Sequence, residues 1–199
     1  MNLPNKISMA RIFMIPVFLV VLLVNIPGIG FEVPVVGVSL YRYIATVIFL
    51  AAAFTDFLDG YYARKYNQIT DLGKFLDPLS DKLLSMAAMV YLVGIGALPS
   101  WVVVIILSRE FFVTGFRAVA AKRGVVMAAD IWGKVKTVFQ IIMTAFILIE
   151  LSSLDGLIPL DVPIFRMINI MMITATVVLT VVSGTLYVWR HKKVLAEGK

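Results

Sequence analysis

Acidic residues are concentrated in one short stretch of a chain that is otherwise strongly apolar. Residues 56–81 contain five of the twelve acidic residues, at positions Asp56, Asp59, Asp71, Asp77 and Asp81. The first two are three residues apart and the last two are four apart, so each of these pairs shares one helical face. Carboxylates held together at partial burial repel one another unless protons or cations neutralise them. Two divalent cations would compensate the cluster, and paired metal ions are a known arrangement for displacement at phosphorus.

Other residues in this stretch suit a phosphate ligand. Gly60 and Gly73 allow backbone or substrate to approach where a side chain would block it. Arg64 supplies a planar fork that matches phosphate geometry. The alternative is a salt-bridge network at the membrane interface, between the acids and the cations Arg64, Lys65, Lys74 and Lys82. Acidic residues at membrane depth favour a functional site over this alternative.

The elements that must position these residues are apolar helices. The chain has 199 residues, of which 61% are hydrophobic and 15% are charged, and its mean hydropathy is +0.97. A soluble domain is usually about 25% charged, and a spanning helix needs roughly 20 apolar residues. The composition therefore predicts a single all-α integral membrane domain over residues 1–199, with no separate soluble domain.

Six apolar segments predict six transmembrane helices after a short basic juxtamembrane segment, residues 1–11. The predicted spans are 12–24, 38–57, 75–93, 101–121, 131–149 and 164–189. A turn is expected at residues 94–99. The spans that carry the aspartates are consecutive and joined by a short connection, so they are expected to be antiparallel neighbours. All four carboxylates at positions 56, 59, 77 and 81 can then converge near one membrane surface.

The distribution of basic residues predicts the orientation of the chain. With the N-terminus inside, 15 Lys and Arg residues lie on the inner side, two (Arg42 and Arg166) lie outside, and Arg109 falls within the fourth span. Such an asymmetry favours both termini in the cytoplasm. The net charge of +6 is accordingly interpreted as topology and contact with anionic lipid headgroups, and no nucleic-acid partner is expected.

The cysteine and histidine content excludes several kinds of chemistry. The chain has no cysteine, which rules out disulfides, thiolate nucleophiles and Cys-based metal sites. The single histidine, His191, lies in a basic tail and is expected to be solvated there. Any metal must be held mainly by oxygen, which favours a hard ion such as Mg²⁺ or Mn²⁺.

A second group of charged residues is basic. Arg109 lies deep in an apolar stretch, and Arg117, eight residues later, lies on roughly the same face. Lys134 and Lys136 begin the fifth span. Together these residues predict a basic wall that faces the aspartates and suits an anionic acceptor. The alternatives are a buried pair of Arg109 with Glu110 or an aspartate, and ordinary positive flanking of a span by the two lysines.

The acidic stretch resembles the signature of the CDP-alcohol phosphotransferase family, D-x₂-D-G-x₂-A-R-x₈-G-x₃-D-x₃-D. Its eight fixed positions are filled by Asp56, Asp59, Gly60, Ala63, Arg64, Gly73, Asp77 and Asp81. The resemblance implies two Mg²⁺ or Mn²⁺ ions held by the four aspartates, with Asp81 as general base on the acceptor hydroxyl. It implies a homodimer, and a CDP site formed by Asn5, Gly60, Ala63, Arg64, Asp71 and Gly73.

Three shorter segments indicate the acceptor. Residues 2–5, 109–111 and 133–137 resemble those of bacterial family members that use sn-glycerol 3-phosphate. The resemblance implies CDP-diacylglycerol as donor, membrane lipids as surroundings, and an acceptor phosphate bound by Arg109, Arg117, Lys134 and Lys136. It places the enzyme in the bacterial cytoplasmic membrane with its active site facing the cytoplasm. The alternatives are cardiolipin or phosphatidylinositol-phosphate synthesis, a metal-dependent prenyltransferase, or a cation transporter.

Overall fold

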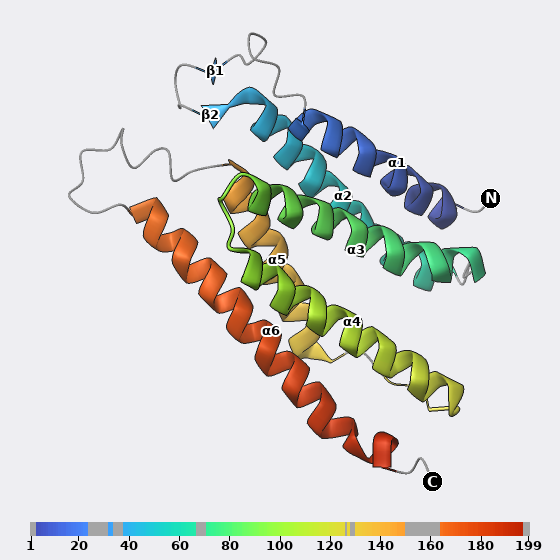
Figure 1. The fold of residues 1–199 in the computed structure, drawn as a ribbon. Helices are drawn as coiled ribbons and strands as arrows, with labels where there is room; N and C mark the ends of the chain where they lie inside the picture. Colours follow the sequence, from blue (N-terminus) through green and yellow to red (C-terminus); the bar gives the residue numbers. More distant parts are fainter. Residues whose placement is uncertain are drawn as a thin grey trace.

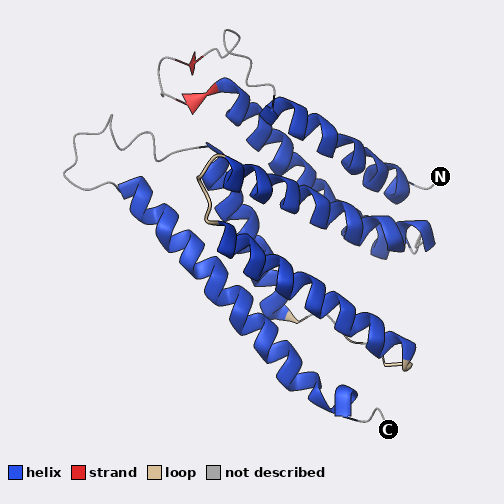
Figure 2. Ribbon diagram, viewed as in Figure 1, coloured by secondary structure: helices blue, strands red, loops and turns tan. Residues whose placement is uncertain are grey.

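Six α-helices form most of the described chain, with a two-stranded antiparallel sheet between the first two (Figures 1 and 2). The computed structural model describes residues 3–23, 32–33, 38–66, 71–125, 127, 130–149 and 164–196, and side chains at 9–23, 41–55, 82–125, 127, 130–149 and 164–191. The helices are α1 (Leu3–Leu23), α2 (Leu40–Tyr66), α3 (Asp71–Gly94), α4 (Ser100–Lys122), α5 (Ile131–Ile149) and α6 (Ile164–Ala196). In the sheet, β1 (Glu32–Val33) pairs with β2 (Val38–Ser39), and Glu32 lies opposite Ser39.

The helical class predicted from the sequence is confirmed, but several element boundaries differ. The expected bounds of the fourth and fifth helices agree with α4 and α5 to within one residue. The expected juxtamembrane segment and first span form one continuous helix from Leu3, because no helix-breaking residue separates them. The second helix begins at Leu40 and not at Val38, which pairs in β2, and it continues to Tyr66. Gly60 does not end it, since one glycine inside a helix costs only about 1 kcal/mol.

The turns that separate α3, α4 and α5 follow recognisable chemistry. The predicted turn at residues 94–99 is present: α3 ends at Gly94, Gly96 has a φ of +74°, and the amide of Ala97 donates to the carbonyl of Leu92 at 2.9 Å. After α4, Gly124 has a φ of +76°, and the amide of Val125 donates to the carbonyl of Ala120 at 3.0 Å. Both glycines adopt the left-handed conformation that terminates helices and that other residues rarely adopt.

Helix direction brings one set of helix ends to the same side of the molecule. Figure 1 shows five helix ends on the same side of the molecule: the start of α1, the end of α2, the start of α3, and the ends of α4 and α6. α2 and α3 run antiparallel, whereas α4 and α6 run parallel to each other and lie in contact. The segments of α2 and α3 that carry the aspartate signature are therefore at the same end of the molecule as the C-terminal halves of α4 and α6.

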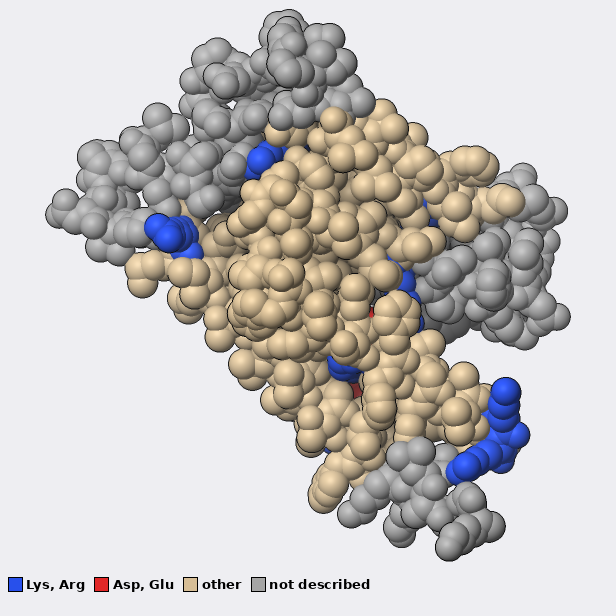
Figure 3. All heavy atoms as spheres, viewed as in Figure 1, with Lys and Arg blue, Asp and Glu red and all other residues tan. Residues whose placement is uncertain are grey.

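The helices bury small and apolar side chains between them and expose others outward. The main core is formed by residues of α1 to α5, including Phe18, Phe49, Leu92 and Ile106, and α6 packs against it. Many outward-facing side chains are large and apolar; Phe13 and Leu23, for example, are each 70% exposed. The face in Figure 3 accordingly has little charge, with Lys and Arg mostly near its margins and a few charged atoms in a hollow. A surface of this kind suits a lipid environment better than water.

Two helices of the described chain are long and apolar enough to cross a bilayer. They are Ile131–Ile149 and the stretch Ile164–His191 within α6, and shorter apolar stretches occur at Met9–Leu23, Tyr41–Thr55 and Lys82–Gly94. The hydroxyls of Thr176 and Thr180 on α6 donate to carbonyls one turn earlier, at 2.8 and 2.7 Å. Such bonds satisfy polar groups where no water is present. The all-helical fold is thus consistent with a membrane protein.

Candidate active site

The aspartate signature lies on two helices whose backbones are described. Asp56 and Asp59 are in the last three turns of α2, and Asp77 and Asp81 are in the first three turns of α3. The side chains of residues 56–81, and that of Asn5, lie outside the described ones. The metal, CDP and general-base assignments made from the sequence therefore stay predictions. Among the side chains that are described, no three acidic, His or Cys residues form a group that could hold a metal ion.

A cavity of about 410 Å³ lies beside this region, where α3, α4, α5 and α6 meet. Arg109, Arg117 and Lys134, three of the four basic residues predicted from the sequence, line it together. Lys82, which directly follows Asp81 in α3, is a fourth cation in its wall. The structure therefore brings the basic residues of α4 and α5 next to the helix that carries two of the aspartates.

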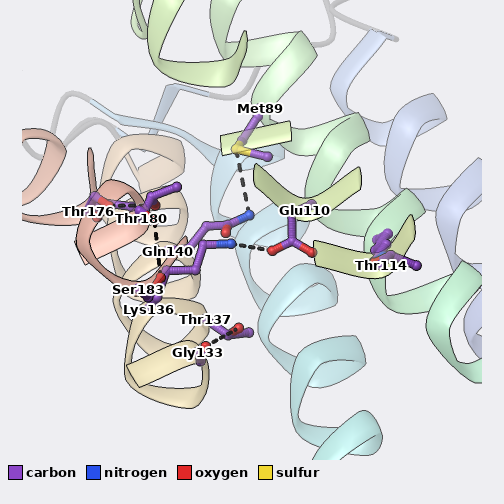
Figure 4. A network of polar contacts seen from close by, with 11 residues as sticks. Met89, Glu110, Thr114, Gly133, Lys136, Thr137, Gln140, Thr176, Thr180 and Ser183 are labelled. Carbon is purple, nitrogen blue, oxygen red and sulfur yellow. Dashed lines mark hydrogen bonds and ion pairs between the residues drawn. The ribbon is translucent and has the colours of Figure 1, made fainter. Parts of the chain in front are cut away.

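The fourth predicted residue, Lys136, is placed differently. Its side chain is fully buried, and its ammonium is bonded to Oε1 of Glu110 on α4 (Figure 4). Glu110 lines the cavity, whereas Lys136 does not appear among the described residues of its wall. From the sequence, Glu110 was considered as a possible ion-pair partner of Arg109. In the structure the Glu110 carboxylate is bonded to Lys136. Two lysines at the start of α5, two residues apart, thus have different environments.

The two carboxylates in the cavity wall are each bonded to a cation that is not part of the wall. Glu110 binds Lys136, and Asp130 binds Arg190 of α6, with 3.0 Å between Asp130 Oδ1 and Arg190 Nη1. Neither of these ion pairs therefore involves a cation of the wall, that is, Lys82, Arg109, Arg117 or Lys134. Several cations in the wall of one cavity form a suitable site for a doubly charged anion such as a phosphate monoester.

The two arginines are held by residues of the neighbouring helices. Tyr187 of α6 is 1% exposed, and its hydroxyl accepts a hydrogen bond of 3.0 Å from Nε of Arg117. The guanidinium of Arg117 also lies over the Tyr187 ring, 5.3 Å from its centroid. Arg109 runs between Gly133 of α5 and Gly184 of α6, and in the described part of the chain its buried Nε has no hydrogen-bond partner.

A smaller cavity of about 50 Å³ adjoins the first. The two share Lys82, Glu110 and Thr137, and Gln140 also lines the smaller one. Gln140 Nε2 points to Met89 Sδ at 3.8 Å, as Figure 4 shows, and its buried Oε1 has no hydrogen-bond partner among the described residues. This cavity is large enough for a water molecule or a small hydroxyl group, and its polar residues could bind either one.

Several of these residues were not found by reasoning from the sequence. Tyr187, Asp130 and Gly184 contribute through helix packing, and no local pattern marked them. Glu110 carried a signal, since it is an acid inside an apolar span, but it was considered only as a partner of Arg109. His191, which was expected to be solvated, is partly exposed and also contacts Tyr187: its Nδ1 lies 2.9 Å from the carbonyl oxygen of Tyr187, and the two rings are 4.7 Å apart.

Comparison with known proteins places these features in a family. The family model described as CDP-alcohol phosphatidyltransferase matches residues 1–189. The chain is 46% identical over 149 residues to a Bacillus subtilis protein named CDP-diacylglycerol–glycerol-3-phosphate 3-phosphatidyltransferase, covering 75% of this chain and 77% of the relative. A Rickettsia felis protein of the same name is 34% identical over 192 residues, which is 96% of each chain. A probable phosphatidylglycerophosphate synthase of Mycobacterium tuberculosis is 37% identical over 190 residues, covering 95% of this chain and 81% of the relative.

Proposed function

Because the chain belongs to the CDP-alcohol phosphatidyltransferase family, we propose that it transfers the phosphatidyl group of CDP-diacylglycerol to sn-glycerol 3-phosphate. The products are phosphatidylglycerophosphate and CMP. The observation that carries this proposal is the cavity in which Lys82, Arg109, Arg117 and Lys134 converge beside the aspartate-bearing helix α3. The names of the similar bacterial proteins support both substrates. Family membership also disfavours the transporter and prenyltransferase alternatives.

The charge of the cavity supports an anionic acceptor. A phosphate monoester carries between one and a half and two negative charges at neutral pH. Four cations whose neighbouring carboxylates are bonded elsewhere favour binding of such an anion, and arginine forks bind phosphate oxygens in pairs. A zwitterionic or cationic alcohol, such as serine or choline, has no net negative charge that would attract it to these cations. Arg109, Arg117 and Lys134 bind the acceptor phosphate, and Lys82 is a fourth contributor.

The buried Lys136 supports the site indirectly, through Glu110. Its bond to Glu110 fixes this carboxylate at the border of the two cavities. The sequence-based assignment of Lys136 as a direct phosphate ligand is therefore replaced, in this proposal, by a role in holding Glu110. The CDP moiety is bound by the residues that the family resemblance implies: Asn5, Gly60, Ala63, Arg64, Asp71 and Gly73.

The aspartates supply the other half of the reaction. Four carboxylates on two adjacent helix segments at one end of the molecule form an oxygen donor set that suits Mg²⁺ or Mn²⁺. Bound there, two such ions supply Lewis-acid stabilisation of the charge on the pyrophosphate. Asp56, Asp59, Asp77 and Asp81 hold them. The Asp81 carboxylate accepts the proton of the acceptor's primary hydroxyl, and that oxygen then attacks the lipid-bearing phosphorus. The bond from this phosphorus to the CMP oxygen breaks, and CMP leaves with the electron pair.

The shared direction of the helix ends supports a proposed membrane arrangement. All six helices cross the bilayer, both termini lie in the cytoplasm, and the catalytic end faces the cytoplasm. The described basic residues support this orientation, because Lys122, Arg123, Lys134 and Arg190 belong to that end while Arg42 and Arg166 lie on the helix ends opposite. The chain is a single domain over residues 1–199, and it works as a homodimer in the cytoplasmic membrane.

The proposal is tested by measuring CMP release from purified protein in lipid nanodiscs that contain CDP-diacylglycerol and Mg²⁺ or Mn²⁺. sn-Glycerol 3-phosphate, inositol phosphate, phosphatidylglycerol and serine are compared as acceptors. Release that depends on glycerol 3-phosphate, with phosphatidylglycerophosphate as lipid product, is the expected result. Release only with another alcohol would refute the acceptor, and no release with any of them would refute the enzymatic assignment.

A further inference from the structure

The last helix, α6, contacts both arginines of the basic cavity through one face. Gly184 lies against Arg109, and Tyr187 binds Arg117. The two α6 residues are three positions apart and so occupy the same helical face. Because α4 and α6 run side by side in the same direction (Figure 1), the earlier residue of each helix meets the earlier residue of the other.

Gly184 leaves space that the Arg109 side chain occupies. A Cβ atom placed at Gly184 would lie 3.0 Å from Cγ and 3.9 Å from Nε of Arg109. The first distance is shorter than ordinary van der Waals contact, so any larger residue would displace the arginine stem. Glycine inside a helix costs about 0.5–1 kcal/mol relative to alanine. At this position the glycine gives passage to the Arg109 side chain.

Two other helical glycines provide an internal scale for this effect. A Cβ atom at Gly133 would lie 3.4 Å from Nη2 of Arg109, which is close to ordinary contact. A Cβ atom at Gly115, on α4 itself, would have nothing within 4 Å. The three positions therefore form a graded series in the space that a side chain would have beside Arg109.

Tyr187 fixes the second arginine in a defined orientation. Its hydroxyl accepts a hydrogen bond of 3.0 Å from Nε of Arg117. Its ring packs edge-on against Phe116, with 6.1 Å between the ring centroids. With Nε engaged by Tyr187, the two terminal amino groups of Arg117 can bind a ligand in the cavity that both residues line. Two parallel N–H groups are the arrangement that binds phosphate oxygens in a bidentate manner.

We propose that Gly184 and Tyr187 are positioning residues for the acceptor phosphate: α6 holds the guanidinium groups of Arg109 and Arg117 in one wall of the cavity. Tyr187 acts through its hydrogen bond to Arg117, and Gly184 acts through the absence of a side chain. This inference rests on the proposed function, in which the cavity binds the phosphate of the acceptor. It assigns to the C-terminal helix a role in acceptor recognition that neither the aspartate signature nor the basic residues of α4 and α5 include.

The first test uses the glycine series Gly184→Ala, Gly133→Ala and Gly115→Ala, with KM measured separately for each substrate. Gly184→Ala is expected to raise KM for glycerol 3-phosphate about tenfold or more, Gly133→Ala a few-fold, and Gly115→Ala not at all. KM for CDP-diacylglycerol should be unchanged in all three. Tm should stay level or rise, because alanine favours helix. Equal acceptor KM values for Gly184→Ala and Gly115→Ala, or a loss at both substrates with a lower Tm, would overturn the role of Gly184.

The second test is a double-mutant cycle between Tyr187→Phe and Arg117→Ala. Tyr187→Phe keeps the ring and removes the hydroxyl, and it is expected to raise KM for glycerol 3-phosphate about tenfold while leaving kcat nearly unchanged. In the Arg117→Ala background the same change should have no further effect, because the arginine that it orients is gone. Full additivity of the two changes would overturn the positioning role of Tyr187.

The two tests separate this inference from the proposed function. If Arg117→Ala raises the acceptor KM but Tyr187→Phe and Gly184→Ala do not, the cavity still binds the acceptor and only the role of α6 is wrong. If Arg117→Ala itself leaves the acceptor KM unchanged, the assignment of the cavity fails and the inference fails with it. Calorimetric titration of glycerol 3-phosphate into each variant provides the same comparison without turnover.

Discussion

The aspartates and the basic cavity differ in how the sequence encodes them. The four signature aspartates lie within 26 consecutive positions on two helix segments, so their spacing alone places them on common helical faces. The basic cavity draws its wall from α3, α4, α5 and α6, and its residues meet only because these helices pack together. Chemistry that is held by local spacing can be recognised in a sequence, whereas chemistry that is held by packing is visible only in part.

The two regions should differ most clearly in their response to the removal of divalent cations. Chelation with EDTA is expected to abolish CMP release, because the carboxylates that hold the metal then only repel one another and the pyrophosphate. Binding of glycerol 3-phosphate to the basic cavity should persist within about threefold, since lysines and arginines supply that site. Activity is measured as CMP release before and after restoring Mg²⁺ or Mn²⁺, and acceptor binding by calorimetry. Full activity in EDTA would contradict the proposed metal site.

Asp81→Asn is expected to have the next largest effect. Loss of a general base commonly lowers turnover by about 10²–10⁴-fold, and Asp81 is also one of the proposed metal ligands. Tm and KM for glycerol 3-phosphate should change little, because the substitution leaves the basic wall intact. The measurement is kcat from CMP release, with the adjacent Lys82→Met as the matched variant that should affect KM for the acceptor. An Asp81→Asn enzyme with full kcat would refute the base assignment.

Helix existence and most boundaries could be predicted because long apolar segments bounded by turns determine them. The bounds of α4 could be predicted because Pro99 directly precedes its first residue and Gly124 follows its last turn. The end of α2 was missed because polarity, which ends a membrane span, does not end a helix. In the cavity, the environments of Lys134 and Lys136 could not be distinguished, since only packing determines which of two nearby lysines is buried against Glu110.

These two lysines provide the third prediction. Lys136→Met removes the bonded partner of Glu110 and leaves its carboxylate with only the cations of the cavity wall nearby, so it should destabilise the protein by up to about 3 kcal/mol. Lys134→Met removes an exposed cation of the cavity wall, so it should leave Tm unchanged and raise KM for glycerol 3-phosphate several-fold. Tm is measured by thermal unfolding in nanodiscs, and KM by CMP release.

A double variant separates the buried pair from a direct ligand. Lys136→Met combined with Glu110→Gln should recover much of the lost stability, because no buried charge is then left without its partner. If Lys136→Met instead keeps the wild-type Tm and raises only the acceptor KM, Lys136 binds the phosphate directly, as the sequence alone suggested. The outcome decides whether one or both lysines belong to the functional wall.

The smallest expected effect concerns the pair of Asp130 and Arg190, and it is informative through its sign. Arg190 is 50% exposed and Asp130 is 15% exposed, so breaking this pair should cost about 1 kcal/mol or less and lower Tm by only a few degrees in either variant. Asp130→Asn removes a negative charge from the cavity wall and should leave the acceptor KM unchanged or lower it. Arg190→Gln leaves that charge without its partner and should raise the acceptor KM, by less than about threefold.

Opposite shifts in KM with similar losses in Tm would show that Asp130 acts on the cavity through its charge and that Arg190 neutralises it from outside. A tenfold rise in the acceptor KM for Asp130→Asn would contradict this and would identify the carboxylate as a ligand of the acceptor hydroxyl groups. In that case the basic cavity would resemble the aspartate region after all, because both would use carboxylates directly on substrate. Steady-state KM values for both variants at one ionic strength are sufficient to distinguish the two results.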